Sequence, residues 1–343
     1  LPFTPTGAQK RAISQAVEDL CREVPMNRLV QGDVGSGKTL VAAACCYFAF
    51  LNGRQSAMMA PTELLAEQHF KTLTGLLSPL GVRVGLLTGS TGAKEKKQIK
   101  AALEAGELDL CIGTHALLTG DVSWAGLGLV VTDEQHRFGV AQRMALTAKG
   151  EGVHTLVMSA TPIPRTLALI IYGDLELSVI DEMPAGRSPV ETYLIDSPKR
   201  ERAFGYIRQH LDRGLQGYIV CPLVEEDPES PMPQGKGAVE WVRQLEQTSF
   251  RGYRLGLLHG RMKPREKEAV MTAFSQGEIQ LLVATTVIEV GIDVPNAVIM
   301  MIENAERFGL SQLHQLRGRV GRGTQRSTCI LLSDTQNPET RQR

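Results

Sequence analysis

The sequence predicts an α/β protein of two tandem domains, each a mainly parallel sheet flanked by helices. Two observations support this fold: short apolar segments alternate with helical segments, and the alternation runs in two successive series. A polar stretch broken by proline and glycine separates the series. Because 343 residues suffice for two ordinary cores, we expect domains at residues 1–183 and 190–343, with a linker at residues 184–189.

The first series consists of apolar segments of strand length with helical segments between several of them. Strands are expected at residues 28–31, 56–60, 82–87, 108–112, 128–132 and 154–159. Helices are expected at residues 40–51, 63–77 and 93–105. Since strands that alternate with helices pair in parallel, helices should cover both faces of this sheet.

The second series repeats the arrangement after the linker. Strands are expected at residues 190–195, 217–221, 253–258, 279–284, 297–301 and 328–332. Helices are expected at residues 199–211, 238–247 and 265–275. Residues 225–237, which contain prolines and acids, predict a long exposed loop.

A phosphate-binding loop joins the first strand to the first helix. It matches the pattern G-x-x-x-x-G-K-[ST] and consists of Gly32, Asp33, Val34, Gly35, Ser36, Gly37, Lys38 and Thr39. Glycines let the backbone turn tightly and direct its N–H groups at phosphate oxygens, and the helix dipole adds to that field. We expect Lys38 to reach the β- and γ-phosphates of a nucleoside triphosphate and the Thr39 hydroxyl to bind Mg²⁺. The strand before the loop and the helix after it disfavour the alternative, a flexible turn without a ligand.

Two adjacent carboxylates follow the apolar strand at residues 128–132. In a protein with a phosphate loop, Asp133 can hold Mg²⁺ through water, and Glu134 can orient and deprotonate an attacking water. An isolated pair of acids is more often a solvated turn, and that alternative stays open. Their position directly after a buried strand favours the catalytic interpretation.

Composition restricts the classes of partner and compartment. The net charge is +0, so no overall field attracts a polyanion and any nucleic-acid contact must be local. The 6 cysteines show no C-x-x-C pairing, which predicts buried, reduced side chains. The most apolar run, residues 41–51, is too short for a membrane span, and the start is not signal-like. A cytoplasmic protein without a membrane partner is expected.

Several motifs, in order, resemble those of the superfamily 2 helicases and in particular the RecG type. D-E-Q-H at residues 133–136 is followed by R-F-G-V-A-Q-R, and M-S-A-T-P-I-P-R-T occupies residues 158–166. The set is completed by P-T-E-L-L-A-E-Q-H at 61–69, G-T-H-A-L-L at 113–118, L-H-G-R-M at 258–262 and A-T-T-V-I-E-V-G-I-D-V-P at 284–295. The resemblance covers essentially the whole chain. It implies two RecA-like domains with ATP in the cleft between them.

The resemblance also assigns residues to the ATP site. It implies that Gln9 reads the purine edge with Phe3 nearby, although composition alone makes Gln9 a surface glutamine on a helix. Arg319 and Arg322, spaced i,i+3 on a predicted helix, are implied to act as fingers on the γ-phosphate. A solvated or phosphate-binding face is the alternative for these arginines. The remaining nucleotide residues implied are Gly291, Asp293 and Gln315.

The same resemblance implies a set of DNA-contacting loops. They contain Pro61, Thr62, Thr88, Gly89, Thr114, His115, His259, Arg261, Thr285 and Thr286. Hydroxyls and backbone N–H groups in such loops bind phosphates without reading bases, but Thr62 is equally placed to be a plain helix cap. Residues implied to couple the ATP site to DNA are His136, Ser159 and Thr161, with a buried structural histidine as the alternative for His136. Trp124 and Trp241 are expected to be packing residues.

The resemblance implies an ATP- and Mg²⁺-dependent DNA helicase, or double-strand DNA translocase. The implied partner is branched double-stranded DNA at forks and four-way junctions, where translocation drives branch migration and fork regression in recombination and repair. A single-strand-binding protein is a further candidate partner, and a monomer is expected. RecG-type proteins carry a wedge domain before this region and a coupling element after it, so we expect a motor core with weakly coupled unwinding.

Two alternative functions remain open, and intact Lys38, Asp133 and Glu134 disfavour a third, a non-catalytic scaffold. One is the motor module of a transcription-repair coupling translocase, against which Gln135 and the Gln142-Arg143 pair favour the RecG type. The other is a non-motor P-loop ATPase switch, which the arginine pair and the loop motifs disfavour.

Overall fold

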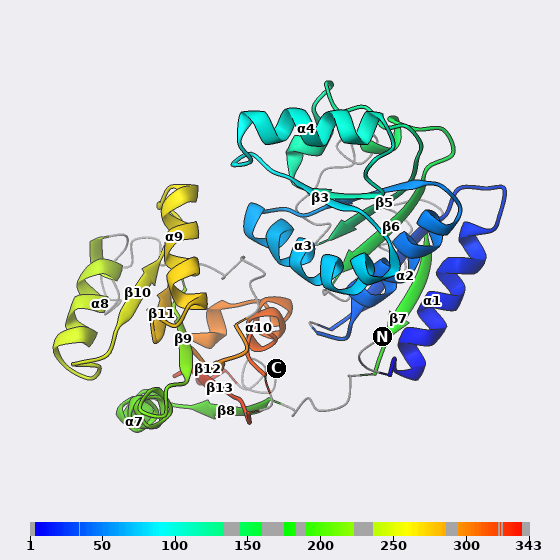
Figure 1. Ribbon diagram of the computed structural model, residues 1–343. Helices are drawn as coiled ribbons and strands as arrows, with labels where there is room; N and C mark the ends of the chain where they lie inside the picture. The colour runs from blue at the N-terminus through cyan, green and yellow to red at the C-terminus, as the bar shows by residue number, and fades with distance from the viewer. Residues whose placement is uncertain are drawn as a thin grey trace. The chain divides into compact units, whose positions relative to one another are not determined.

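The computed structural model describes residues 4–33, 35–133, 145–159, 175–182, 190–222, 236–285, 294–321, 323 and 325–337. The chain divides into two compact units, Leu1–Pro184 and Ala185–Arg343. In each unit a sheet is flanked by helices (Figure 1).

Unit 1 contains a sheet in which all neighbouring strands of the described part are parallel. Its strands are β1 (Asn27–Gly32), β2 (Gln55–Met59), β3 (Val84–Leu87), β4 (Leu110–Gly113), β5 (Leu127–Asp133), β6 (His154–Ser159) and β7 (Glu176–Ile180). They lie in the order β3-β4-β2-β5-β6-β1-β7. Its helices are α1 (Gly7–Leu20), α2 (Lys38–Leu51), α3 (Glu63–Leu77) and α4 (Ala93–Glu104). Parallel pairing places the carboxyl ends of all these strands at one edge, where ligands of such sheets bind.

Apolar clusters cover both faces of this sheet. Met58 and Val131 face one core together with side chains of α1, α2 and α3. Their neighbours Ala57 and Val130 face the other core together with Leu103 of α4. Because successive strand residues point to opposite faces, a register slip of one residue would exchange these two sets. The pattern therefore fixes which side chains of each strand point to which face of the sheet.

Unit 2 contains a second sheet, again parallel throughout its described strands. Its strands are β8 (Glu191–Ile195), β9 (Gln216–Val220), β10 (Leu255–Leu258), β11 (Leu281–Ala284), β12 (Ala297–Ile302) and β13 (Thr328–Leu332). They lie in the order β10-β11-β9-β12-β13-β8. Its helices are α7 (Arg200–Leu211), α8 (Lys236–Gln247), α9 (Pro264–Ser275) and α10 (Leu310–Arg317). Phe204, Ile207 and Leu245 of α7 and α8 pack in a core with Ile219 and Val283 of the sheet.

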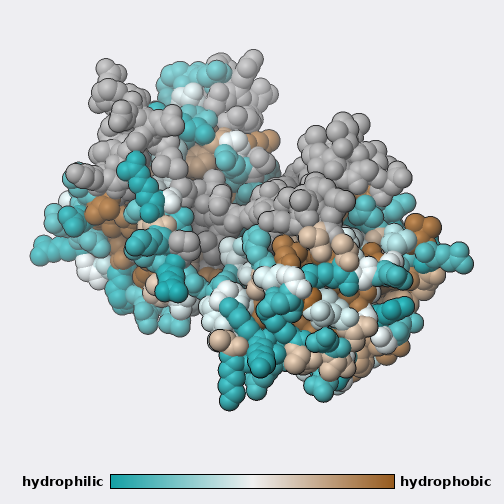
Figure 2. All heavy atoms as spheres, turned by 90° about the horizontal axis from the view of Figure 1, so that it is seen from above, coloured by the Kyte–Doolittle hydropathy of each residue, from teal (hydrophilic) through white to brown (hydrophobic). Residues whose placement is uncertain are grey.

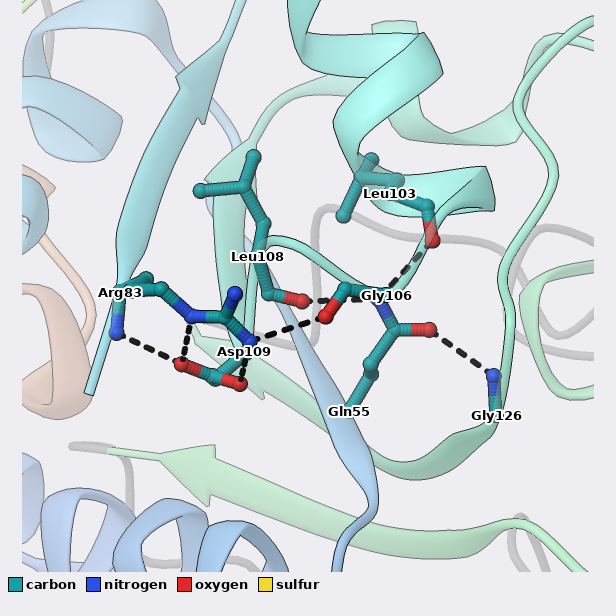
Figure 3. Close-up of polar contacts among 7 residues, drawn as sticks. All are labelled: Gln55, Arg83, Leu103, Gly106, Leu108, Asp109 and Gly126. Carbon is teal, nitrogen blue, oxygen red and sulfur yellow. Dashed lines mark hydrogen bonds and ion pairs between the residues drawn. The ribbon is translucent and has the colours of Figure 1, made fainter. Parts of the chain in front are cut away.

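Polar side chains hold the amino-terminal edge of the unit 1 sheet together (Figure 3). Gln55 Nε2 donates to the carbonyl oxygens of Leu103 (2.9 Å) and Leu108 (2.7 Å), and its Oε1 accepts from the Gly126 N–H (2.9 Å). Arg83 donates to both carboxylate oxygens of Asp109, at 2.9 and 2.7 Å. Partial burial raises the pKa of Asp109, but the hydrogen bonds from Arg83 lower it, and the net result is a pKa below the usual value. These contacts connect β2, β3 and β4 at their amino ends, whereas the predicted DNA loops follow their carboxyl ends.

The predicted fold class is confirmed: both units are α/β with parallel sheets and flanking helices. Strand β7 was not predicted, because Glu176 and Ser178 interrupt its apolar run. The expected loop at residues 225–237 is wrong at its end, since α8 already includes Lys236 and Gly237. Residues 223–235 and the predicted linker at residues 184–189 lie outside the described residues.

Two other local expectations are wrong. The predicted helix through Arg319 and Arg322 stops at Arg317. Gly321 has φ 78°, a left-handed conformation that a continuing helix cannot contain. Cys21 is exposed, whereas the other cysteines are buried; all of them are free thiols.

On the face drawn in Figure 2, hydrophilic side chains cover much of the described surface and hydrophobic ones form separate small patches. Among the described helices, none combines the length and the apolar character needed to cross a bilayer. Trp124 and Trp241 pack against the cores of units 1 and 2, which confirms them as packing residues.

Candidate functional site

The phosphate loop connects β1 to α2 at the carboxyl edge of the unit 1 sheet. Gly35 and Gly37 have φ values of 78° and 92°, in the left-handed region that favours glycine. A Cβ atom at Gly37 would lie 2.2 Å from Gln9 Nε2, and one at Gly32 would lie 2.5 Å from Ser36 Oγ. Helix α2 follows Gly37 directly, and this N-cap residue makes no side-chain capping bond. A glycine loop leading into an uncapped helix start suits a phosphate anion, so these residues fit ATP.

The Lys38 ammonium lies over this loop. Its Nζ donates to the carbonyl oxygens of Gly32 at 2.8 Å and Asp33 at 2.9 Å. These contacts keep the positive charge beside the backbone that would cradle the phosphates.

Gln9 lies behind the loop and is only 2% exposed. Its Nε2 donates to the carbonyl oxygen of Ser36 at 2.7 Å, and its Oε1 accepts from the Thr6 N–H at 3.0 Å. The second bond belongs to a capping box that begins α1. The composition-based expectation of a surface glutamine is therefore wrong, because this amide ties α1 to the phosphate loop. Its contact with a purine stays a prediction.

Asp133 ends β5 at the same edge. Because β5, β6 and β1 are neighbours, Asp133, Ser159 and the phosphate loop follow one another along it. The Asp133 side chain is 13% exposed. A carboxylate and the Thr39 hydroxyl are hard oxygen ligands, and Mg²⁺ usually takes only one or two carboxylates together with phosphate oxygens and water. These residues therefore fit a magnesium ion.

Asp133 has a partner whose role the sequence did not indicate. His69 Nε2 lies 2.7 Å from Asp133 Oδ2. His69 belongs to α3 and is 7% exposed. In the sequence it is simply the last residue of a motif assigned to DNA contact, and no spacing rule connects it with a carboxylate 64 residues away.

The predicted DNA loops of unit 1 follow three neighbouring strands, β2, β3 and β4. The residues concerned are Pro61, Thr62, Thr88, Gly89, Thr114 and His115. The Thr62 hydroxyl accepts from the Leu65 N–H at 3.3 Å and caps α3, so the alternative of a helix cap is confirmed. His115 is exposed at the start of a short 3-10 helix, His115–Leu118. Contact of these loops with DNA stays a prediction.

Two of these loops are connected to each other. Glu63 Oε1 accepts from the Ser90 N–H at 3.0 Å, and a Cβ atom at Gly89 would lie 2.6 Å from the same oxygen. Thr88 Oγ1 lies 3.0 Å from Ser90 Oγ and 3.1 Å from Thr91 Oγ1. The loop after β3 is thus held against the start of α3.

A repeat in unit 2 supports the equivalent loops there. With identical spacing, Arg83, Gly85, Gly89, Gly106 and Thr114 recur as Arg254, Gly256, Gly260, Gly277 and Thr285. The side-chain contacts recur too: Gln216 Nε2 donates to the carbonyl oxygens of Phe274 at 2.6 Å and Ile279 at 2.7 Å, as Gln55 does in Figure 3.

The repeat places His259 and Thr285 after β10 and β11, where Thr88 and Thr114 follow β3 and β4. Arg261, two residues after His259, is exposed. This ungapped repeat is visible in the sequence, although the motifs alone do not reveal it.

Arg319 lies in the turn after α10 and is 9% exposed, and Gln315 is half-buried within α10. Because α10 ends at Arg317, the prediction that Arg319 and Arg322 share one helix face is wrong, although their proposed charge role does not depend on it. Several predicted residues lie outside the described part of the chain: Phe3, Val34, Glu134, His136, Thr161, Thr286, Gly291, Asp293 and Arg322.

Comparison with known proteins decides the family. Residues 6–170 match the DEAD/DEAH box helicases, and residues 206–324 match the helicase conserved C-terminal domain. The ATP-dependent DNA helicase RecG of Synechocystis sp. is 52% identical over 343 residues, 100% of this chain and 41% of the relative. The chain belongs to the RecG-type helicases.

Other RecG proteins show the same relation. RecG of Thermotoga maritima is 52% identical over 332 residues, 97% of this chain and 42% of the relative. RecG of Escherichia coli K12 is 51% identical over 347 residues, 100% of this chain and 50% of the relative. The chain thus spans half or less of the length of these three RecG relatives.

Solved structures agree with the fold. A structure of RecG bound to a three-way DNA junction matches with a TM-score of 0.87 and 48% identity, covering 100% of this chain and 44% of that one. Yeast Dbp5 bound to RNA and ADP BeF3 matches with a TM-score of 0.68 at 17% identity, covering 99% of this chain and 85% of that one. The second likeness shows the fold alone.

Proposed function

We propose that this chain is an ATP-driven motor that moves along double-stranded DNA. One sheet edge of unit 1 carries the phosphate loop and Asp133 after β1 and β5, and the Thr62, Thr88 and Thr114 loops after β2, β3 and β4. This shared edge is the observation that supports coupling of a nucleotide site to a nucleic-acid surface within one rigid sheet. It favours a motor over a non-motor ATPase switch, which has no use for the second set of loops.

Each residue at the nucleotide site has a proposed task. Lys38 and the loop N–H groups hold the phosphates, while Thr39 and Asp133 hold Mg²⁺. Glu134 orients and deprotonates the attacking water, and Arg319 and Arg322 neutralise charge on the transferring phosphoryl group. Bound ATP and Mg²⁺ supply the free energy of hydrolysis and the local neutralising charge. The remaining nucleotide-site assignments, Phe3, Gln9, Gly291, Asp293 and Gln315, rest on the resemblance to RecG-type proteins.

The DNA loops are proposed to bind backbone phosphates. Their hydroxyls and N–H groups carry no base-specific pattern, and contact with phosphates alone suffices for movement along any sequence. Because this chain's overall charge is +0, the grip must come from these local groups.

The proposed substrate is branched double-stranded DNA. A RecG relative at 48% identity was solved on a three-way DNA junction. By extension we propose that translocation drives branch migration and fork regression in DNA recombination and repair, in the cytoplasm, by a monomer. A single-strand-binding protein is retained as a proposed partner.

The test is the steady-state rate of ATP hydrolysis with and without forked DNA, for the wild type and Glu134→Gln. The proposal expects strong stimulation by forked DNA and loss of hydrolysis in the variant with nucleotide binding retained. A wild-type rate that ignores DNA would remove the motor. A fully active Glu134→Gln would remove Glu134 as the base.

A further inference from the structure

The contact between His69 and Asp133 joins two regions with different proposed tasks. Nε2 and Oδ2 are 2.7 Å apart, and the two side chains are only 9% and 13% exposed. Hydrogen bonds to an ionised carboxylate are stronger than those between neutral groups. A carboxylate that is mostly shielded from water and loses its hydrogen-bond partner destabilises the folded state, because its lost hydration is no longer compensated. His69 therefore helps fix the orientation of the carboxylate that is proposed to hold Mg²⁺.

His69 is carried by a helix that begins at a proposed DNA loop. Thr62 caps α3, seven residues before His69. Seven residues are close to two helical turns, so both residues lie on nearly the same face, about 10 Å apart along the axis. Leu65, Ala66 and Leu73 are buried and hold α3 on the sheet. A displacement of the first turn of α3 therefore also displaces the His69 side chain.

The start of α3 also holds the next loop. Glu63 accepts from the Ser90 N–H at 3.0 Å, so the loop containing Thr88 and Gly89 is attached to the same helical turn. Two proposed phosphate-binding loops thus converge on one end of α3, and the Asp133 carboxylate contacts the same helix two turns further on.

We propose that His69 is a positioning residue that links occupancy of these loops by DNA to the orientation of Asp133. It acts through Asp133 and touches no reacting group. The proposal rests on the proposed motor function and adds a route within unit 1 that does not require His136, Ser159 or Thr161. Its consequence is thermodynamic: DNA must change Mg²⁺-dependent nucleotide affinity by some factor, and nucleotide must change DNA affinity by the same factor.

Equilibrium binding tests this route without hydrolysis. A fluorescent non-hydrolysable ATP analogue is titrated against Mg²⁺ with and without a synthetic three-way DNA junction, for the wild type, His69→Gln and His69→Asn. The longer Gln side chain can place an amide N–H where Nε2 lies, whereas Asn falls short. We expect Gln to keep the wild-type coupling factor. Asn should bring that factor to within about twofold of one and raise the Mg²⁺ concentration for half-saturation on the order of tenfold.

The pair of variants separates positioning from folding. Gln and Asn differ by one methylene, so a difference between the two variants shows that the side-chain amide must reach the Asp133 carboxylate. Thr72→Ala, at an exposed position of the same helix, serves as the matched control. A merely structural histidine would give equal loss in both variants with the coupling factor unchanged, which would overturn the proposal while leaving the motor intact. A wild-type coupling factor of one would also overturn the route, whereas the motor itself is tested separately by DNA-stimulated hydrolysis.

Discussion

Replacing Gln9 by leucine should loosen the phosphate loop even when no nucleotide is present. The amide is 2% exposed and donates to the Ser36 carbonyl at 2.7 Å. Leucine has a similar volume, so little cavity forms, but the carbonyl stays buried without its donor, at a cost of about 1–3 kcal/mol. Loss of the acceptor for the Thr6 N–H adds a smaller cost at the start of α1.

A total of about 2 kcal/mol should lower the melting temperature of unit 1 by roughly 4–8 °C. Tryptophan fluorescence can follow this unit alone, because the chain has 2 tryptophans and Trp241→Phe leaves only Trp124, which packs in the unit 1 core. Lys10→Ala is the matched control, since Lys10 is the exposed neighbour of Gln9 on α1.

An unchanged melting temperature in Gln9→Leu would show that the amide does not hold the loop. The affinities for ATP and GTP then separate the two roles of Gln9. A loop-holding amide lowers both affinities by the same factor, whereas a loss confined to ATP reveals contact with the purine edge.

Four further outcomes follow from individual residues. Gly37→Ala should abolish nucleotide binding in a filter assay, because a Cβ at φ 92° would lie 2.2 Å from Gln9 Nε2. Arg319→Ala should lower ATP hydrolysis by at least about 10²-fold while equilibrium ATP binding stays within about threefold, and equal losses in both would contradict a finger role. Burial raises the pKa of Glu303 although Arg200 donates a hydrogen bond to it, so the ionised carboxylate lowers the free energy of unfolding. Glu303→Gln should therefore stabilise unit 2 against urea at pH 7 but not at pH 4. Burial lowers the pKa of His154, whose Nδ1 accepts from the Met26 N–H at 2.9 Å, so urea stability of unit 1 should fall as the pH drops below 6.5, and His154→Gln should flatten that dependence.

Elements with strong local signals could be predicted from the sequence. The glycines of the phosphate loop identify the turn between β1 and α2, and the apolar run of β5 identifies a strand, without any tertiary information. Strand β7 could not be found this way, since its polar Ser178 is satisfied by Arg28 of β1 and Gln15 of α1, 150 and 163 residues away in the chain. The end of α10 was misjudged because the arginine spacing suggested a helix face, whereas Gly318 and the left-handed Gly321 end it.

In the candidate site, too, residues of contiguous motifs could be predicted, whereas contacts between distant segments could not. Asp133 and Lys38 belong to motifs that are contiguous in sequence, so their type and spacing were enough to name them. The burial of Gln9 and its bond to Ser36 depend on where α1 packs, and the hydrogen bond of His69 with Asp133 depends on how α3 packs on the sheet. Such contacts join residues far apart in the chain, and no local pattern records them.

Displacement of a third strand from a triplex measures ATP-driven movement along duplex DNA without any unwinding of the duplex. We expect this chain to release the third strand only with ATP and Mg²⁺, and we expect no release by Lys38→Ala. DNA-stimulated hydrolysis without any strand release would contradict this expectation.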